Sequence, residues 1–163
     1  MIYWTQFTHR DWSFILAATD KGLCFTGSEN QGEEELLQWA GKRRKGVSVE
    51  RNDEYLLPYA EQFRAYLDGK REILNVPVDA EGTPFQQQVW RALQDIPFGE
   101  VRCYGDIAHA IQKPKAVRAV GAAIGANPVM VIIPCHRVIG KNGSLTGFRG
   151  GLSMKQRLLQ LEK

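Results

Sequence analysis

Several common features are missing from this chain of 163 residues, and each absence excludes a class of protein. No apolar run reaches the roughly 18 residues that a membrane-spanning helix needs, and the N-terminus lacks the pattern of a signal peptide. Cysteine is scarce, because Cys24, Cys103 and Cys135 are far apart and form no C-x-x-C motif. We therefore expect no disulfide framework, no structural metal site and no membrane association, and a reducing compartment such as the cytoplasm.

Acidic residues are missing from one long segment. Residues 107–160 contain eight Lys or Arg and no Asp or Glu, whereas the rest of the chain has 13 Lys or Arg against 18 Asp or Glu, a net charge of −5. Solvated surfaces ordinarily mix the two signs. A segment of one sign favours a polyanionic partner, usually nucleic acid, although a basic face without a partner is the alternative. The eight residues are Lys113, Lys115, Arg118, Arg137, Lys141, Arg149, Lys155 and Arg157.

The first half of the chain has the pattern of a small mixed domain. Residues 2–26 are rich in aromatic and β-branched side chains and predict strands, and residues 34–41 and 53–67 predict helices. The basic run at residues 42–45 fits a solvated helix end, with a nucleic-acid contact as the alternative. Nothing in this half indicates catalysis.

The pattern changes after residue 78. Residues 83–86 (TPFQ) are typical of a helix N-terminus, with a threonine cap, a first-turn proline and a glutamine three residues on. Helices over residues 104–111 and 115–125, joined by a tight turn, predict a helix-turn-helix. The sequence thus predicts an α/β (α+β) fold, with a small N-terminal sheet-and-helix domain over residues 1–78 and a mainly helical DNA-binding domain over residues 79–163.

The second helix of this pair has an apolar side and a side that is small or basic. We expect Val117, Val120 and Ile124 to face inward. The opposite side carries only small side chains and basic ones, so it could approach a sugar-phosphate backbone closely. Helix pairs of this size also occur in proteins that bind no DNA, so the charge of the segment decides in favour of DNA. The residues of the opposite side are Lys115, Arg118, Ala119, Ala122 and Ala126.

An apolar, β-branched run leads to the one cysteine with chemically active neighbours. The run begins at Val131 and is interrupted by Pro134, so we expect a rigid strand-like segment that ends there. Cys135 follows, with His136 and Arg137 beside it, and both neighbours would favour a thiolate. The alternative is a buried structural cysteine.

This motif, with Asn127-Pro128 before it and Gly150-Gly151 after it, resembles the active-site signature of the O6-alkylguanine-DNA alkyltransferases, also called methylated-DNA–protein-cysteine methyltransferases. The resemblance spans about residues 82–162 and includes the helix-turn-helix. It implies direct repair of double-stranded DNA: the alkyl group of O6-alkylguanine, and also of O4-alkylthymine, moves irreversibly to Cys135 after minor-groove binding and base flipping. Each protein molecule would react once, as a monomer, without cofactor, metal or obligate protein partner.

The resemblance also implies roles for individual residues. His136 would act as general base through a water, Glu162 would orient it, Tyr104 would donate a proton to the guanine, and Asn127 would tie the helix-turn-helix to the active-site turn. Phe148 departs from the tyrosine that the family often has, which removes a hydroxyl contact. The implied substrate pocket consists of Tyr104, Pro134, Val138, Phe148 and Arg149. Arg118 would fill the gap left by the flipped base, and the implied DNA contacts are completed by Lys113, Lys115, Ala119 and Ala122.

Other functions remain open from the residues alone. A DNA-binding alkyltransferase-like protein would lack the cysteine, which this chain has. A cysteine hydrolase using Cys135 and His136 would not account for the basic segment and would turn over. A transcription factor with an incidental thiol would keep all function without Cys135. For Glu162, the alternative to a catalytic role is a solvated charge near the chain end.

Overall fold

A computed structural model describes all 163 residues and divides them into two compact units, Met1–Ala80 and Glu81–Lys163. The first is a sheet with two helices and the second is mainly helical, so the predicted α/β (α+β) class is confirmed. The expected boundary after residue 78 lies two residues before this division. That each unit is an independent domain stays a prediction. No helix has the length and apolar character needed to cross a membrane.

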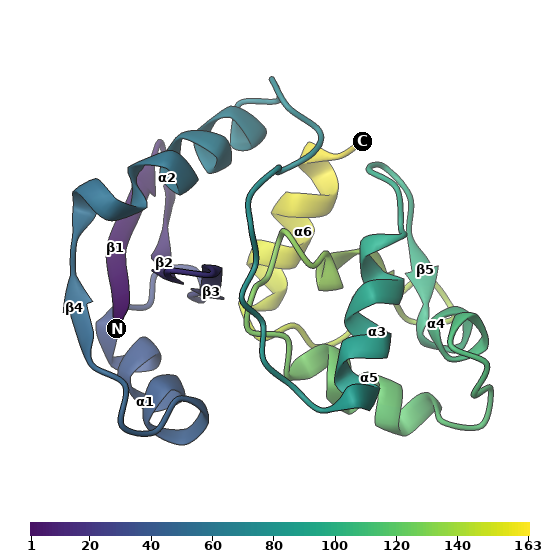
Figure 1. Cartoon of the computed structure of the whole chain (residues 1–163). Helices are drawn as coiled ribbons and strands as arrows, with labels where there is room; N and C mark the ends of the chain where they lie inside the picture. Colours follow the sequence, from purple (N-terminus) through teal and green to yellow (C-terminus); the bar gives the residue numbers. More distant parts are fainter. The chain divides into compact units, whose positions relative to one another are not determined.

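The first unit is built on a four-stranded sheet (Figure 1). β1 and β2 form an antiparallel hairpin in which His9 pairs with Trp12 across a two-residue turn. β3 continues the antiparallel order, and β4 joins the other edge of the sheet parallel to β1. The sheet order is β3-β2-β1-β4, and the strands are β1 (Ile2–His9), β2 (Trp12–Thr19), β3 (Gly22–Thr26) and β4 (Val49–Arg51).

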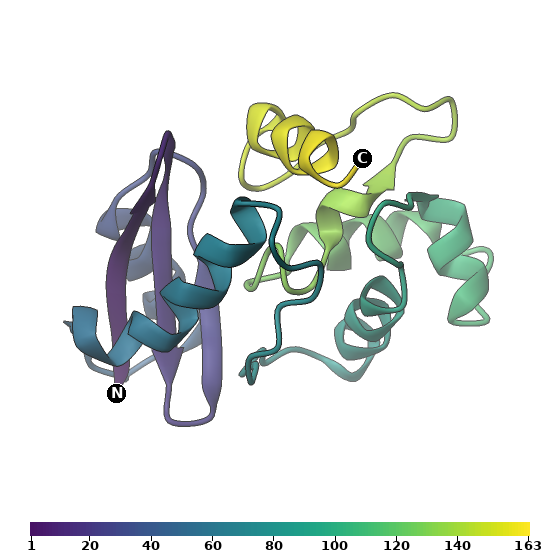
Figure 2. The same ribbon diagram turned by 90° about the horizontal axis from the view of Figure 1, so that it is seen from above.

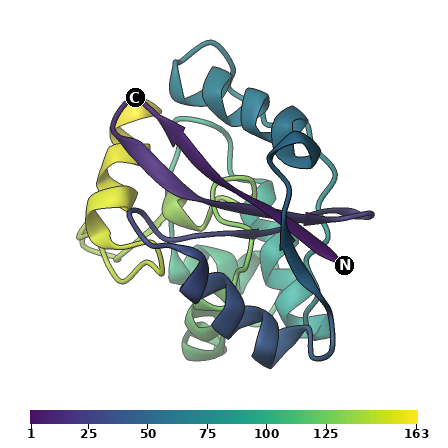
Figure 3. The same cartoon turned by 90° about the vertical axis from the view of Figure 1, so that its left-hand side faces the viewer.

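Two helices cover opposite faces of this sheet, as Figures 2 and 3 show for α1 (Glu33–Arg43) and α2 (Asp53–Leu67). Because side chains alternate along a strand, Ile15 of β2 joins the core that contains Leu36 of α1, whereas Phe14 packs edge-on against Phe63 of α2 at 5.9 Å. Both faces of β2 are therefore buried, which explains why it lacks the polar alternation of a half-exposed strand.

One prediction for this unit is wrong at a single residue, Arg44, whereas residues 42, 43 and 45 are exposed at the end of α1 as expected. The basic run at residues 42–45 is not wholly a solvated helix end, because the Arg44 side chain is 8% exposed and forms an ion pair with Asp79 at 3.2 Å. Its second nitrogen donates to the Asp79 carbonyl at 2.8 Å, and Thr19 donates to the Asp79 carboxylate at 2.6 Å. Arg44 therefore ties α1 to the segment that leaves this unit. A pair separated by 35 residues has no local sequence signal.

The second unit begins with α3 (Pro84–Gln94), and its predicted start is confirmed. The Thr83 hydroxyl accepts from the Gln86 amide at 3.1 Å, and the Gln86 side chain accepts from the Thr83 amide at 2.9 Å. The helix-turn-helix consists of α4 (Tyr104–Ala110) and α5 (Val117–Gly125). Its second helix starts two residues later than expected, because the backbone turns through Pro114 and Lys115 first.

The segment before Cys135 is not the strand that its composition indicates. Val131 has φ of +78°, a conformation that β-branched residues rarely adopt, and the backbone turns instead of extending. The Asn127 side chain accounts for the turn, since it accepts from the Val129 amide and donates to the Ile133 carbonyl. The chain then forms a short 3-10 helix (Cys135–Arg137), a two-stranded parallel pair of β5 (Arg102–Cys103) with β6 (Val138–Ile139), and α6 (Leu152–Leu161).

Candidate active site

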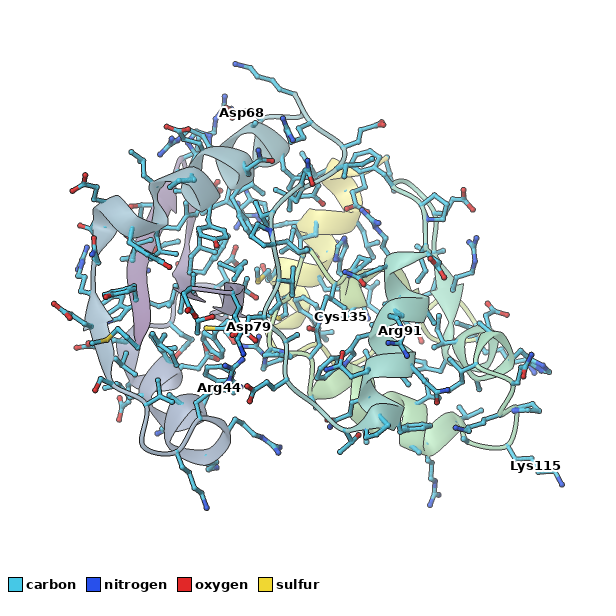
Figure 4. The ribbon with its side chains drawn as sticks, in the orientation of Figure 1. Arg44, Asp68, Asp79, Arg91, Lys115 and Cys135 are labelled. Carbon is cyan, nitrogen blue, oxygen red and sulfur yellow. The ribbon has the colours of Figure 1, made fainter.

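Cys135 lies at the start of the 3-10 helix, directly after Pro134, and is only 4% exposed (Figure 4). Burial raises the pKa of its thiol above the usual 9.0, because the anion would lose water. A hydrogen bond from Asn127 and the positive charges of Arg149 and Lys155 oppose this shift. In the resting protein Cys135 is therefore a thiol that needs a base, surrounded by groups that favour its anion.

Asn127 links α5 to the cysteine. It lies two residues after the last residue of α5 and is 1% exposed. Its amide donates to the Ile133 carbonyl at 2.8 Å, and its carbonyl accepts from the Val129 amide at 2.9 Å. Both hydrogen bonds lie within the turn that precedes Cys135. The side chain that follows α5 thus fixes the backbone of the turn that leads to the thiol.

Glu162 binds both residues that follow Cys135. Its Oε2 lies 2.8 Å from His136 Nε2, and Arg137 donates to its two carboxylate oxygens at 2.8 and 2.9 Å. Arg137 also donates to the Ile96 carbonyl at 2.8 Å. Glu162 is 3% exposed, so it is no solvated terminal charge; it is the anionic centre of a buried network.

This arrangement settles which nitrogen of His136 can accept a proton. A carboxylate only accepts hydrogen bonds, so a neutral His136 must carry its hydrogen on Nε2. Nδ1 is then the basic nitrogen, and this buried atom has no hydrogen-bond partner in the protein. Burial lowers the pKa of His136 below 6.5, against the opposing effect of Glu162. The imidazole is therefore neutral at pH 7 and able to act as a base.

Arg137 does not have the effect on Cys135 that its position in the sequence suggests. Its guanidinium faces Glu162 and lies 5.8 Å from the centre of the Phe98 ring. The positive charges that favour the thiolate come instead from Arg149 and Lys155. The expectation that both neighbours of Cys135 stabilise its anion is therefore wrong for Arg137, because adjacent side chains point in different directions.

Lys155, one of the eight basic residues of the segment without acidic residues, is the main residue whose place in this site the sequence did not indicate. It is 1% exposed, and its ammonium donates to the Val138 carbonyl at 2.6 Å and to the Thr146 carbonyl at 3.2 Å. Burial lowers its pKa, which the nearby Cys135 opposes. It thus joins the turn after Cys135 to the loop that leads into α6. Its only sequence signal is a lysine at a position where α6 is otherwise apolar, between Met154 and Leu158.

The loop of residues 140–151 supplies three further groups. Thr146 pairs its hydroxyl with that of Tyr104 at 2.6 Å. Arg149 donates to the Asn127 and Pro128 carbonyls at 3.4 and 3.2 Å. Phe148 is half-buried. The loop therefore contacts both α4 and the Asn127 turn. A side chain at Gly150 would overlap Phe148 and Met154, since its Cβ would lie 2.7 and 2.6 Å from their atoms.

The outer side of α5 is exposed and basic. Val120 and Ile124 are buried as expected, but Val117 is 41% exposed, because α5 only begins there. Lys115 precedes the helix and extends away from the unit (Figure 4). Lys113 is held against α3, where it donates to Gln88 at 3.0 Å and lies over the Phe85 ring. The exposed residues on this side include Lys115, Arg118, Ala119 and Ala122.

Known proteins share both units. Residues 84–163 match the family described as "6-O-methylguanine DNA methyltransferase, DNA binding domain", and residues 2–80 match its "ribonuclease-like domain". A Bacillus subtilis (strain 168) protein named "Methylated-DNA--protein-cysteine methyltransferase, inducible" is 56% identical over 162 residues, covering 99% of this chain and 90% of that protein. The chain belongs to the 6-O-methylguanine DNA methyltransferase family.

Solved structures agree with this assignment. The crystal structure of Mycobacterium tuberculosis O6-methylguanine methyltransferase has a TM-score of 0.84 and 38% identity, over 100% of this chain and 93% of that chain. A second structure, of the Mycobacterium tuberculosis protein in complex with DNA, has a TM-score of 0.85 and 37% identity, over 99% and 92% of the two chains. The resemblance inferred from the Cys135 motif is therefore confirmed.

Within this methyltransferase family fold, the structure connects most of the residues that the sequence indicated. Asn127 and Cys135 share one turn, His136 contacts Glu162, and Tyr104 contacts the loop that contains Phe148 and Arg149. Arg118, Ala119 and Ala122 form a separate exposed surface on α5. The catalytic and binding roles of all these residues stay predictions. No group of three or more His, Cys, Asp or Glu side chains is placed to hold a metal ion.

Proposed function

We propose that this chain repairs double-stranded DNA by transferring the alkyl group of O6-alkylguanine to Cys135, once per molecule. Membership of the family supports the reaction type. The single observation that carries the assignment to Cys135 is that its buried thiol directly precedes His136, whose neutral imidazole is hydrogen-bonded to the Glu162 carboxylate. We also propose that the protein acts as a monomer. We place it in the cytoplasm, where its three free cysteines stay reduced.

The chemistry of the substrate explains why a cysteine is needed. The reacting carbon is saturated and bonded to a mediocre leaving group, so a soft, strong nucleophile is required. The Cys135 thiol gives its proton through a water to Nδ1 of His136, and the resulting thiolate attacks the alkyl carbon. The carbon–oxygen bond breaks as the carbon–sulfur bond forms. Guanine leaves with the bonding electron pair and takes up one proton, with Tyr104 as donor.

The base must leave the helix before it can react. Its alkyl group lies within the stacked duplex, and flipping the nucleotide out costs a few kcal/mol. The exposed surface of α5 suits this task, because small residues at Ala119 and Ala122 allow close approach to a groove and Arg118 extends from the same side. We place α5 in the minor groove, with Arg118 in the space that the flipped base vacates.

The test of this function is a mass measurement of the intact protein. After incubation with an excess of duplex DNA containing O6-methylguanine, we expect a gain of one methyl group, about 14 Da, and no second addition. A thioether has no low-energy hydrolytic route, and a neighbouring thiol cannot reduce it as it would a disulfide. Continued release of repaired DNA beyond one equivalent would show a turning-over enzyme, and DNA binding without a mass gain would show a binding protein.

Arg118→Ala should slow repair of duplex DNA much more than reaction with free O6-benzylguanine. Only the duplex requires extrusion of the base, so only there does the loss of the filling side chain matter. We expect a decrease of about tenfold to a hundredfold on the duplex, equivalent to roughly 1–3 kcal/mol, and little change with the free base. The measurement is the single-turnover rate with each substrate.

The matched control for this variant is Arg91→Ala, which removes an exposed arginine from α3 instead of α5 (Figure 4). Its rates with both substrates should stay near those of the unaltered protein. An equal loss on duplex and free base in Arg118→Ala would exclude a role in extrusion.

A further inference from the structure

Thr146 is held from two sides at the edge of the candidate site. Its hydroxyl oxygen lies 2.6 Å from the Tyr104 hydroxyl, and its carbonyl accepts from the buried ammonium of Lys155 at 3.2 Å. The same ammonium donates to the Val138 carbonyl, three residues after Cys135, at 2.6 Å. One connected path of hydrogen bonds therefore runs from the turn that contains the nucleophile to the hydroxyl of Tyr104.

We propose that Thr146 is a positioning residue for alkyl transfer, which donates its hydroxyl hydrogen to Tyr104 and so directs the Tyr104 hydrogen toward the departing guanine. The inference rests on the proposed function and deepens it. Neither the local sequence around Thr146 nor the Cys135 motif indicates this contact, since the two hydroxyls are 42 residues apart.

Two hydroxyl groups at this distance share one hydrogen between them and leave the other free. If Tyr104 donated to Thr146, its hydrogen would be turned away from the substrate. If Thr146 donates, the Tyr104 hydrogen is free for a ring nitrogen of guanine, and the threonine stabilises the negative charge that grows on the phenol oxygen. One proton leaves the Cys135 thiol and one proton reaches guanine, so the overall reaction creates no net charge.

The surroundings of Thr146 fix the position of its hydroxyl. A β-branched side chain has few rotamers, and the Lys155 contact fixes the backbone from which it extends. On the other side, the Tyr104 ring lies against α5, where a Cβ placed on Gly121 would be 3.9 Å from it. Tyr104 is thus held by its ring through α5 and by its hydroxyl through the loop, with Thr146 as the only side chain shown bonded to that hydroxyl.

The test compares two substitutions of similar size. Thr146→Val keeps the shape and removes the hydroxyl, whereas Thr146→Ser keeps the hydroxyl. With duplex DNA containing O6-methylguanine, we expect the single-turnover rate of Thr146→Val to fall by about threefold to thirtyfold. The rate of Thr146→Ser should stay within about twofold of the unaltered protein, and DNA affinity should be the same in all three.

Repeating the Thr146 substitution in a Tyr104→Phe variant isolates the hydrogen bond between the two hydroxyls. In Tyr104→Phe, which has no phenol hydroxyl, adding Thr146→Val should cost nothing further, because the interaction is already absent. The inference is overturned if Thr146→Val reacts as fast as the unaltered protein, if Thr146→Ser is as slow as Thr146→Val, or if Thr146→Val slows Tyr104→Phe by the same factor. These outcomes leave the proposed function standing. Failure of the unaltered protein to accept a methyl group rejects both.

Discussion

Cys135→Ser should accept no methyl group from O6-methylguanine DNA while still binding the duplex. A hydroxyl is a harder and weaker nucleophile than a thiolate, and its pKa is too high for the neutral His136 to deprotonate it at pH 7. The DNA surface that we propose on α5 does not include residue 135, so the affinity for DNA should be kept. Intact mass and a gel-shift titration on the same sample separate these two effects, with no detectable mass gain expected over hours.

The other two cysteines provide the controls, and the structure decides how each is replaced. Cys24 is fully buried in the apolar core of the first unit, so alanine, which adds no polar group to that core, is preferable to serine. Cys103 is the N-cap of α4, and its sulfur accepts from the Asp106 amide, a contact that serine can replace. Both variants should gain one methyl group. A labelled peptide containing Cys24 or Cys103 would place the acceptor elsewhere.

The fold was predictable where its signals are local. The Thr83–Gln86 capping box lies within four residues, and the sequence predicts it and the helix-turn-helix as the structure has them. The turn before Cys135 was not predictable from the sequence, because its β-branched composition favours a strand. Only the hydrogen bonds of Asn127 force Val131 into its left-handed conformation. Arg44 was misplaced for a similar reason, since its partner Asp79 is distant in the sequence.

The candidate site shows the same division. Cys135, His136 and Glu162 were identifiable because their motif is specific. Lys155 and Thr146 were not, because a lysine in an amphipathic helix and a threonine in a loop are ordinarily solvated. Their places in the candidate site depend on hydrogen bonds to Val138 and Tyr104 across the fold, which no sequence spacing encodes. Arg137 was identified correctly as a neighbour and wrongly as a stabiliser of the thiolate.

Glu162→Gln should lower both the stability of the protein and its rate of methyl transfer. Arg137 would keep the Ile96 carbonyl but lose the carboxylate that balances its buried charge, which typically costs about 3–5 kcal/mol in the free energy of unfolding. His136 would lose the anion that accepts from Nε2 and that opposes the lowering of its pKa, so Nδ1 would become a weaker base. We expect single-turnover transfer to be slower by about tenfold to a hundredfold.

A second substitution separates the two effects. In Glu162→Gln with Arg137→Met, the buried cation is gone, so much of the unfolding free energy should return. The rate should stay low, because His136 still faces a neutral amide in place of a carboxylate. Urea unfolding and single-turnover kinetics on the four proteins of this cycle give both quantities. If the rate recovered together with stability, Glu162 would act only by holding the fold, and the base would have to be sought elsewhere than in the His136–Glu162 pair.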